Sequence, residues 1–399
     1  MQIQRHYFKK LWGEISDRKI SILLGARQVG KSTLLRQLER EAKKQGYATG
    51  FYDLEQPADL KKLAGDSENV IGELTEKTRV AFIDEFHYLK NASKLFKAIY
   101  DSGKRVKIYA SGSSSLEIHK HIKESLAGRF IRTMIFPLSL SEWRQVKGFK
   151  ERDYLEWGGL PGLIHQHTDE ERVGLLDNIL STYITKDIKG LIKEENVRAF
   201  NSLLYLVAQS QGALTAASGL ARETGISEST VARHLEVMAQ TYVLHALPSY
   251  STNMANELKK SKKYYFFDGG IRNALLKDFR PAEEREDKGV LYETAVMLHL
   301  ISRLKPNMEL RFWRTKKGEE VDFVLVKNRV PLPIEVKSDL TKPEIPWGLK
   351  SFLRRYPKTP FAVVFNNSFE DIVQTDTGRQ LYFKKWTKVE ELDYLQEIR

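Results

Sequence analysis

The chain has 399 residues and a mass of 46.1 kDa, which is too long for one ordinary domain and long enough to bury more than one core. Hydrophobic residues make up 41% and charged residues 29%, and no apolar run approaches the ~20 residues that span a bilayer, so disordered and membrane-spanning classes are excluded. The formal net charge of +12 favours an acidic partner, with nucleic acid first and an anionic membrane surface second.

Cysteine usage and the first residues bear on the compartment. The chain contains no cysteine, which excludes disulfides and thiolate metal sites and agrees with a reducing environment. Its opening stretch, MQIQRHYFKKLWGEI, mixes charged and aromatic side chains without the apolar core of a signal peptide. We therefore expect a cytoplasmic protein that is neither secreted nor bound in a membrane.

The first third of the chain alternates short apolar runs with amphipathic stretches. The apolar runs are ISILLGA, ATGFYDL, RVAFIDE and VKIYASGS, and the first amphipathic helix is expected from about Lys31 to Gln45, closed by Gly46. Strands that alternate with helices in this way indicate a parallel sheet covered on both faces. This part of the chain is therefore expected to be an α/β domain.

A P-loop pattern, GxxxxGKS, lies directly after the first apolar run and directly before the helix. Backbone N–H groups of such a loop, together with the helix N-terminus, form a cradle for anions. Lys31 is expected on the outer phosphates of ATP, and the Ser32 hydroxyl on Mg²⁺. The alternative, a chance glycine-rich turn, does not account for the flanking strand and helix. The predicted ATP-binding loop comprises Gly25, Ala26, Arg27, Gln28, Val29, Gly30, Lys31, Ser32 and Thr33.

Two adjacent acids end the apolar run RVAFIDE. Asp84 is expected to bind the Mg²⁺ shell, and Glu85 to polarise the attacking water as a general base. Charges at the end of a buried strand are poorly solvated, so a bound metal and nucleotide would account for both acids. The alternative is that they are two surface acids at the start of a loop. Glu85 therefore favours hydrolysis over binding alone.

Further candidates for the nucleotide site follow along the chain. The run KIYASGSSSLE predicts a strand that ends in small polar residues, of which Ser111 or Ser113 could contact the γ-phosphate, although such serines commonly cap turns. Arg129 and Arg132 are candidates for an arginine finger, in the same chain or across a subunit interface. Surface arginines of a basic protein are the alternative.

The middle of the chain reads as helical. GGLPG marks a sharp loop within the segment from about Ser141 to Asn201. The run ALTAASGLARETGISESTVARHLEVMAQTYVL predicts a helix-turn-helix in which Ser227 caps the second helix, and YVLHALPSY with KYYFFD could form a wing. The run ELKKSKKYY suits a phosphate backbone, or a solvated loop. The second helix is expected to expose few cationic side chains, which disfavours sequence-specific reading of DNA; they are Glu228, Ser229, Arg233 and His234.

The last third returns to mixed strands and helices and contains a second group of acids. Asp322 lies in the predicted strand EVDFVLV, and Glu335 and Lys337 lie two residues apart in the strand LPIEVKS. Residues i and i+2 of a strand project from one face, so these three side chains can converge across the short connection KNRVPLP. Outward charges on an ordinary alternating strand are the alternative. Glu319 and Glu320 are further candidate metal ligands, and Glu320 is expected to lie nearer to the metal.

The order of these motifs resembles a known family. GARQVGKSTLLRQL, FIDEFHYL, ASGSSSLEI, SLAGRF, FPLSLSEW and GGLPG, followed by KYYFFDGGIRNALL, LYETAV, WRTKKGEEVDFVL and IEVKS, resemble prokaryotic AAA+ superfamily ATPases (AAA_14 type core) with a C-terminal DUF4143 domain. The resemblance implies an ATPase core, a winged helix and a nuclease-like C-terminal fold. The acid-lysine group resembles the PD-(D/E)xK nuclease core, in which a helical glutamate, here Glu293, joins the Mg²⁺ ligands Asp322 and Glu335, while Lys337 orients water or stabilises negative charge.

We therefore predict an α/β protein with four parts: a P-loop AAA+ type parallel sheet (1–140), a helical lid (141–198), a winged helix (199–262) and a PD-(D/E)xK-like α/β domain (263–399). The preferred function couples ATP hydrolysis to engagement or remodelling of DNA, with Mg²⁺-dependent DNA cleavage by the C-terminal domain. The alternatives are an ATP-dependent switch or scaffold that binds without cutting, and a ring translocase. The ring requires a homo-oligomer in which Arg129 or Arg132 reaches a neighbouring nucleotide.

Overall fold

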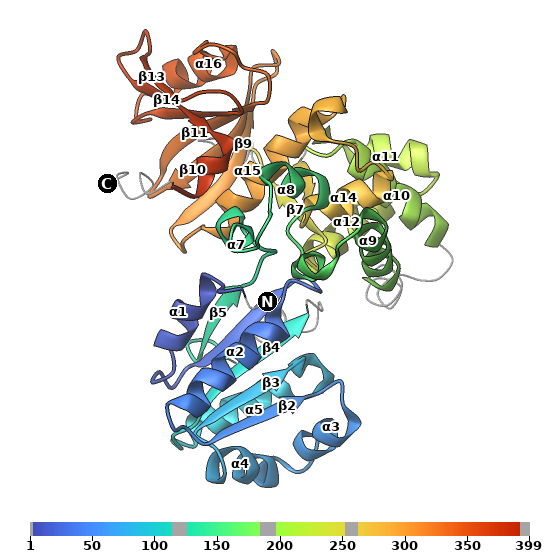
Figure 1. Cartoon of the computed structure of the whole chain (residues 1–399), viewed down its shortest axis with the longest axis vertical. Helices are drawn as coiled ribbons and strands as arrows, with labels where there is room; N and C mark the ends of the chain where they lie inside the picture. The colour runs from blue at the N-terminus through green and yellow to red at the C-terminus, as the bar shows by residue number, and fades with distance from the viewer. Residues whose placement is uncertain (1–2, 114–125, 184–196, 252–261, 392–399) are drawn as a thin grey trace. The chain divides into compact units, whose positions relative to one another are not determined.

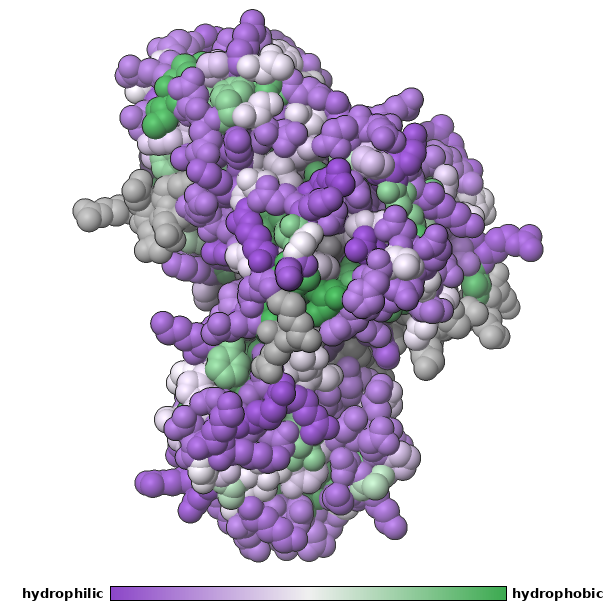
Figure 2. Space-filling model, in the orientation of Figure 1, coloured by the Kyte–Doolittle hydropathy of each residue, from purple (hydrophilic) through white to green (hydrophobic). Residues whose placement is uncertain are grey.

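The computed structural model describes residues 3–113, 126–183, 197–251 and 262–391, which form two compact units (Figure 1). The N-terminal unit is Met1–Leu138 with the short segments Leu160–Gly162 and Gln240–Val243. The C-terminal unit consists of Ser139–Gly159, Leu163–Ala239 and Leu244–Arg399. No helix within the described ranges is both long and apolar enough to cross a membrane, and Figure 2 shows hydrophilic residues over most of the face in view.

The N-terminal unit is built on a five-stranded sheet in the order β2-β3-β4-β1-β5, and all neighbouring strands run parallel. Every residue of β1 and β3 is buried, as expected for central strands of a sheet covered on both faces. The elements are α1 (Tyr7–Gly13), β1 (Ile20–Gly25), α2 (Lys31–Lys44), β2 (Thr49–Asp53), α3 (Pro57–Leu63), α4 (Ser67–Glu76), β3 (Val80–Asp84), η1 (Phe86–Tyr88), α5 (Ala92–Asp101), β4 (Lys107–Ser113) and β5 (Phe130–Met134).

The first part of the C-terminal unit is mainly helical and contains a helix-turn-helix beside a three-stranded antiparallel sheet of order β6-β8-β7. Gly225 makes the turn in the left-handed region at φ 71°, and the Ser227 hydroxyl accepts a hydrogen bond from the Thr230 amide at 3.1 Å, as the sequence predicts. The elements are α7 (Leu140–Trp143), α8 (Glu151–Trp157), η2 (Pro161–His165), α9 (Asp169–Tyr183), α10 (Val197–Gln209), β6 (Leu214–Thr215), α11 (Ala217–Thr224), α12 (Glu228–Gln240), β7 (Leu244–Leu247) and β8 (Lys262–Phe266).

The second part of the C-terminal unit is a six-stranded mixed sheet of order β13-β14-β12-β11-β10-β9. Strands β9, β10 and β11 are antiparallel, whereas β11, β12 and β14 run parallel. The elements are α14 (Gly269–Leu276), η5 (Ala282–Glu284), α15 (Lys288–Ser302), β9 (Met308–Arg314), β10 (Glu320–Lys327), β11 (Val330–Lys337), α16 (Trp347–Arg355), β12 (Ala362–Asn366), β13 (Asp371–Gln374), β14 (Gln380–Lys385) and η6 (Trp386–Glu391).

The connection between β10 and β11 is shorter than the sequence indicates. Asn328 and Arg329, at φ 50° and 66°, form a two-residue turn, which suits the twist of a hairpin. Pro331 and Pro333 lie inside β11 opposite Val326 and Val324, and β11 joins its second neighbour only from Ile334 onward. The prolines therefore sit where the strand has one partner, which spares a missing N–H.

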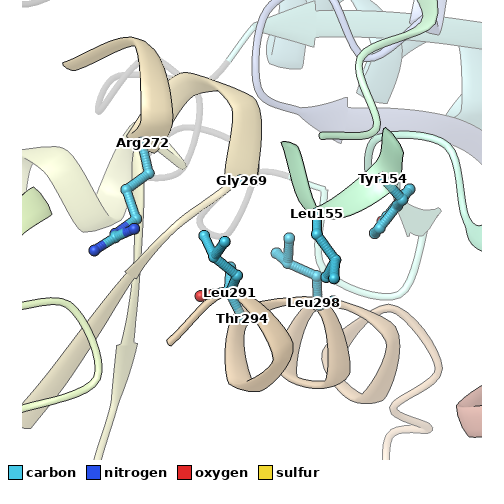
Figure 3. A pocket seen from close by; sticks show the side chains of 8 residues that line it. Tyr154, Leu155, Gly269, Arg272, Leu291, Thr294 and Leu298 are labelled. Atoms are coloured by element: carbon cyan, nitrogen blue, oxygen red, sulfur yellow. The ribbon is translucent and has the colours of Figure 1, made fainter. Parts of the chain in front are cut away.

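Helices α8, α14 and α15 pack closely within the C-terminal unit. The cavity between them has a volume of about 10 Å³, near the size of one water molecule, and Figure 3 shows the apolar side chains that line it together with Arg272. The Asn273 amide on α14 donates to the carbonyls of Leu155 (3.0 Å) and Glu156 (2.8 Å) at the end of α8. These contacts join α14 to α8, and α15, which carries Glu293, lines the same cavity.

Candidate functional site

The P-loop connects β1 to α2, and its two glycines have specific structural roles. A Cβ on Gly25 would lie 2.2 Å from the carbonyl oxygen of Ile135, and Gly30 caps α2 in the left-handed region at φ 91°. Gln28 also has a positive φ, of 65°. The ammonium of Lys31 is buried and donates to the carbonyls of Gly25 (3.1 Å) and Ala26 (2.9 Å), so it lies over the loop itself.

The acid at the end of β3 meets hydroxyls from two other elements. Because β4 lies between β1 and β3, the Ser111 hydroxyl reaches Asp84 Oδ1 and donates a hydrogen bond to it. Ser32, at the start of α2, also hydrogen bonds to Asp84. Burial raises the pKa of Asp84, and these two hydrogen bonds oppose that rise. The Ser32 hydroxyl and the Asp84 carboxylate are hard oxygen donors beside the loop, which fits Mg²⁺.

Glu85 begins the loop after β3 in a conformation that is uncommon outside glycine. Its φ is 53°, and its amide donates to Ser111 Oγ at 3.2 Å. The Glu85 carboxylate lies 3.1 Å from Nδ1 of His87, and both side chains are mostly buried. The sequence motifs do not identify His87, and its position two residues after Glu85 is the one local signal for it.

Arg5 supports the P-loop from a distant part of the sequence. Its guanidinium is buried and donates to the carbonyl of Val29 at 2.8 Å and to that of Phe136 at 2.7 Å. It thereby joins the loop to the segment after β5. Nothing in the local sequence distinguishes Arg5 from a surface arginine, and the contact is visible only in the folded chain.

The remaining candidates of the N-terminal unit lie as follows. Arg129 precedes β5 and forms an ion pair with Asp101 at 2.9 Å. Because β5 runs parallel to β1 with Phe130 beside Ile20, Arg129 lies about 16 Å from the loop end of the sheet. A role at the nucleotide of its own chain therefore does not fit. Arg132 is exposed midway along β5. Ser113 ends β4 beside Gly25, and its side chain, like residues 114–125, lies outside the described part.

In the C-terminal unit, the hairpin of β10 and β11 brings Asp322, Glu335 and Lys337 together. The Asp322 amide lies 3.3 Å from Glu335 Oε2, and Asp322 Oδ2 accepts from the Val336 amide at 2.9 Å. Lys337 Nζ lies 2.7 Å from Glu335 Oε1. A register shift in the pairing of β10 with β9 falls between Val321 and Val324, at Asp322.

Glu293 joins this group from α15, together with two residues of β8. The Tyr265 hydroxyl donates to Glu293 Oε1. Lys263, two residues earlier on the same strand, has its Nζ 3.5 Å from Glu293 Oε1 and 2.7 Å from Glu320 Oε1. Lys263 is 2% exposed. The expectation that this lysine-rich run meets phosphate in solvent is thus wrong for Lys263, while residues 257–261 of the run are outside the described ranges.

The acids and lysines of this group shift one another's pKa values. Burial, and then the charge of Asp322, raise the pKa of Glu293 and that of Glu335. Burial alone would lower the pKa of Lys263, but the nearby carboxylates outweigh it and the net shift is upward. Glu319 lies apart, since its carboxylate accepts from Ser351 (2.6 Å) and Thr315 (2.9 Å).

The present arrangement of these acids does not fit a metal ion. Within the described ranges, no three His, Asp or Glu side chains are placed so that they could hold one. Carboxylate oxygens that a metal would need already contact Lys263, Lys337 and Tyr265. The donor chemistry is suitable for Mg²⁺, but the oxygens have other partners.

The helix-turn-helix exposes a mixed face. Glu228, Ser229 and Arg233 of α12 are exposed, as expected, but His234 is buried and packs edge-on against Phe200. The helical period explains the difference, because His234 lies beside Leu235 on the buried side. Burial also lowers the pKa of His234. It is therefore a core residue.

Three family profiles match consecutive segments of the chain. Residues 17–144 match the AAA domain family, residues 149–282 match a domain of unknown function (DUF8612), and residues 288–386 match a domain of unknown function (DUF4143). The AAA segment contains the P-loop, Asp84 and Glu85. The DUF4143 segment contains Glu293 and the β10–β11 hairpin, whereas Lys263 and Tyr265 belong to the DUF8612 segment.

Similar proteins occur in bacteria and archaea. An uncharacterized protein of Mycobacterium tuberculosis is 26% identical over 351 residues, covering 87% of this chain and 76% of the relative. One of Methanocaldococcus jannaschii is 24% identical over 336 residues, covering 78% and 73%.

Solved structures match at low similarity. The ORC1 protein of Aeropyrum pernix in complex with DNA is 12% identical with a TM-score of 0.30, covering 70% of this chain and 94% of that one. AMPPCP-bound DnaA of Aquifex aeolicus is 15% identical with a TM-score of 0.34, covering 59% and 88%. The family profiles are more direct: the chain is similar to an AAA domain over residues 17–144 and to the DUF4143 domain over residues 288–386.

Proposed function

We propose that this protein binds and hydrolyses ATP with Mg²⁺ at the P-loop of its N-terminal unit. The observation that carries the proposal is the meeting of Asp84 with the hydroxyls of Ser32 and Ser111 beside the loop of Lys31. These groups come from β3, β4 and α2, and the match of residues 17–144 to the AAA domain family supports the same chemistry.

Each side chain has a distinct task in this proposal. The loop amides and the N-terminus of α2 bind phosphate oxygens, and Lys31 exchanges its loop carbonyls for the outer phosphates. Ser32 and Asp84 would hold Mg²⁺, which neutralises charge on the phosphates when bound. Glu85 accepts a proton from the attacking water, and the His87 imidazole lies beside its carboxylate.

ATP turnover is proposed to accompany engagement or remodelling of DNA. The net charge of +12 and the helix-turn-helix of α11 and α12, which we interpret as part of a winged helix with β7 and β8, support an anionic partner. The α12 sequence has one arginine and no lysine, which favours contact with the DNA backbone or with protein over reading of bases.

Lys31→Ala tests the proposed ATP site. We expect loss of both ATP binding and ATP hydrolysis in steady-state assays, because the loop loses its charge for the outer phosphates. Lys61→Ala, at an exposed lysine of α3, is the matched control and should behave as the original chain. Turnover that survives in the purified Lys31→Ala protein would contradict the proposal.

A second candidate function is Mg²⁺-dependent cleavage of DNA by the C-terminal unit. The contacts of Asp322 with the β11 backbone and of Lys337 with Glu335 favour it, because they unite acids and a lysine at one end of a hairpin. Cleavage of labelled single-stranded, duplex and branched DNA with Mg²⁺ or Mn²⁺ is the test. Activity that is lost in both Asp322→Ala and Lys337→Ala supports it, whereas binding without cleavage favours a switch or scaffold.

A further inference from the structure

Lys263 is placed unusually for a lysine. It lies on β8 between Leu214 of β6 and Leu247 of β7 in the strand register, and its side chain is 2% exposed. A lone ammonium in such a place is very unfavourable unless opposite charges compensate it. The compensation comes from Glu320 at 2.7 Å and Glu293 at 3.5 Å.

Three further residues contact or make room for the two carboxylates beside Lys263. Tyr265 projects from the same face of β8, two residues on, and its hydroxyl donates to Glu293. Arg314 Nη1 lies 2.8 Å from the other oxygen of Glu320. Gly212 leaves room for Glu293, since a Cβ there would lie 3.3 Å from Glu293 Oε1.

The role of Lys263 follows from the positive and negative charges that gather around it. The four carboxylates of the group are those of Glu293, Glu320, Asp322 and Glu335. Their cations are the ammonium groups of Lys263 and Lys337 and the partly exposed guanidinium of Arg314, which contacts Glu320. Lys337 contacts Glu335 at the partly exposed edge, whereas Lys263 lies inside, between Glu293 and Glu320. A divalent cation shared by Glu293 and Asp322 would meet the positive charge of Lys263 at short range.

We propose that Lys263 is a built-in cation of this group: its ammonium neutralises Glu293 and Glu320 from within the protein and competes with divalent metal ions for their oxygens. The inference rests on the metal site that the second candidate function requires. It also explains why the acids, although gathered, are not arranged to hold a metal within the described residues. The competing residue comes from the DUF8612 segment, outside the DUF4143 segment that contributes the acids.

Mn²⁺ binding to the full chain tests the inference, and electron paramagnetic resonance measures it through the signal of the free ion. All variants carry Asp84→Asn, so that the P-loop contributes no metal site. We expect Lys263→Gln to bind Mn²⁺ about tenfold more tightly than this parent, because the metal no longer competes with the ammonium group; groups that contact metal ligands change metal affinity by about tenfold or more. Lys262→Gln, at the exposed neighbouring lysine, should match the parent. Adding Asp322→Ala to Lys263→Gln should abolish the tight site.

The possible results separate the two proposals. Equal Mn²⁺ affinity of the parent and Lys263→Gln, sensitive to Asp322→Ala, overturns the role of Lys263 and leaves the metal site standing. No Asp322-dependent binding in either protein overturns both. If Lys263→Gln does not fold without metal, as judged by circular dichroism, recovery of its folded spectrum with Mn²⁺ is the predicted result, and a spectrum that stays unfolded in saturating Mn²⁺ counts against the inference.

Discussion

The environment of single residues decides which polar side chains belong to a site. Lys31, Asp84 and Glu85 could be singled out from sequence because their spacing is tied to a strand end and a helix start. Arg5 and Lys263 could not, since each acts on residues far along the chain: Arg5 on Val29, and Lys263 on Glu293 and Glu320. Tertiary contact, not local pattern, gives these two residues their roles.

Glu85→Gln tests the general base at the residue scale. The amide keeps the size of the side chain but cannot accept the proton of water, so hydrolysis should fall about 100-fold or more while ATP binding is kept. A fluorescent ATP analogue measures binding, and phosphate release measures turnover. Glu76→Gln, at an exposed acid of α4, is the control. Undiminished phosphate release from Glu85→Gln would remove this residue from the mechanism.

Helices and strands position these residues. The sequence predicts the helices and strands themselves better than the contacts between them. The strands RVAFIDE and KYYFFD and the helix carrying Glu293 form as expected, because their apolar patterns match the faces that are buried. The predicted connection KNRVPLP contains Pro331, which the structure places inside β11, where the strand has one partner and tolerates a proline. His234 was expected to be exposed, but the helical period puts it in the core.

Gly158 in GGLPG ends α8 where that helix packs against the start of α14. Its φ is 80°, and a Cβ would lie 2.2 Å from Asp268 Oδ1 and 2.5 Å from the Gly270 nitrogen. Gly158→Ala should therefore lower the free energy of unfolding by about 2 kcal/mol or more in urea titrations. Gly174→Ala, in open space on α9, should raise it by up to about 1 kcal/mol. Equal stability of the two variants would refute this account of the motif.

Asp287, just before α15, gives a pH-dependent prediction. It accepts from Arg285 (2.8 Å) and Arg272 (2.7 Å), whose side chains are each 1% exposed. Burial alone would raise the pKa of Asp287, but these hydrogen bonds lower it to about 2. The folded-state pKa is thus below the usual ~3.9, so the stabilisation is present above about pH 4 and is lost as the pH falls toward 2.

Asp287→Asn should therefore destabilise the chain by about 3 kcal/mol at neutral pH, because the buried guanidinium of Arg272 loses its ion-pair partner and that of Arg285 keeps only Asp278, 3.7 Å away. The difference from the original chain should shrink as urea titrations move from neutral pH to about pH 3. Asp376→Asn is the control, since its partner Arg354 is 66% exposed and such pairs contribute under about 1 kcal/mol. A difference for Asp287→Asn that is independent of pH would speak against the ion pair.

At the scale of the whole molecule, the N-terminal unit and the β10–β11 hairpin follow from sequence because both depend on short motifs with fixed spacing. The group around Glu293 could be predicted only in part, since the sequence identifies the acids but not the lysine that accompanies them. Cations and anions from segments matched to different families meet there. The division into four domains stays a prediction, and the structure forms two compact units.

Steady-state ATP hydrolysis by the full chain with Mg²⁺, measured with and without single-stranded and duplex DNA and beside Lys31→Ala, decides whether the P-loop hydrolyses ATP and responds to DNA. Our account predicts turnover that DNA alters and that Lys31→Ala abolishes, because the P-loop site is the source of hydrolysis and DNA is its partner. If neither DNA changes the rate of ATP hydrolysis, the ATPase activity is not linked to DNA. The absence of any turnover in the folded original chain would contradict the claim itself.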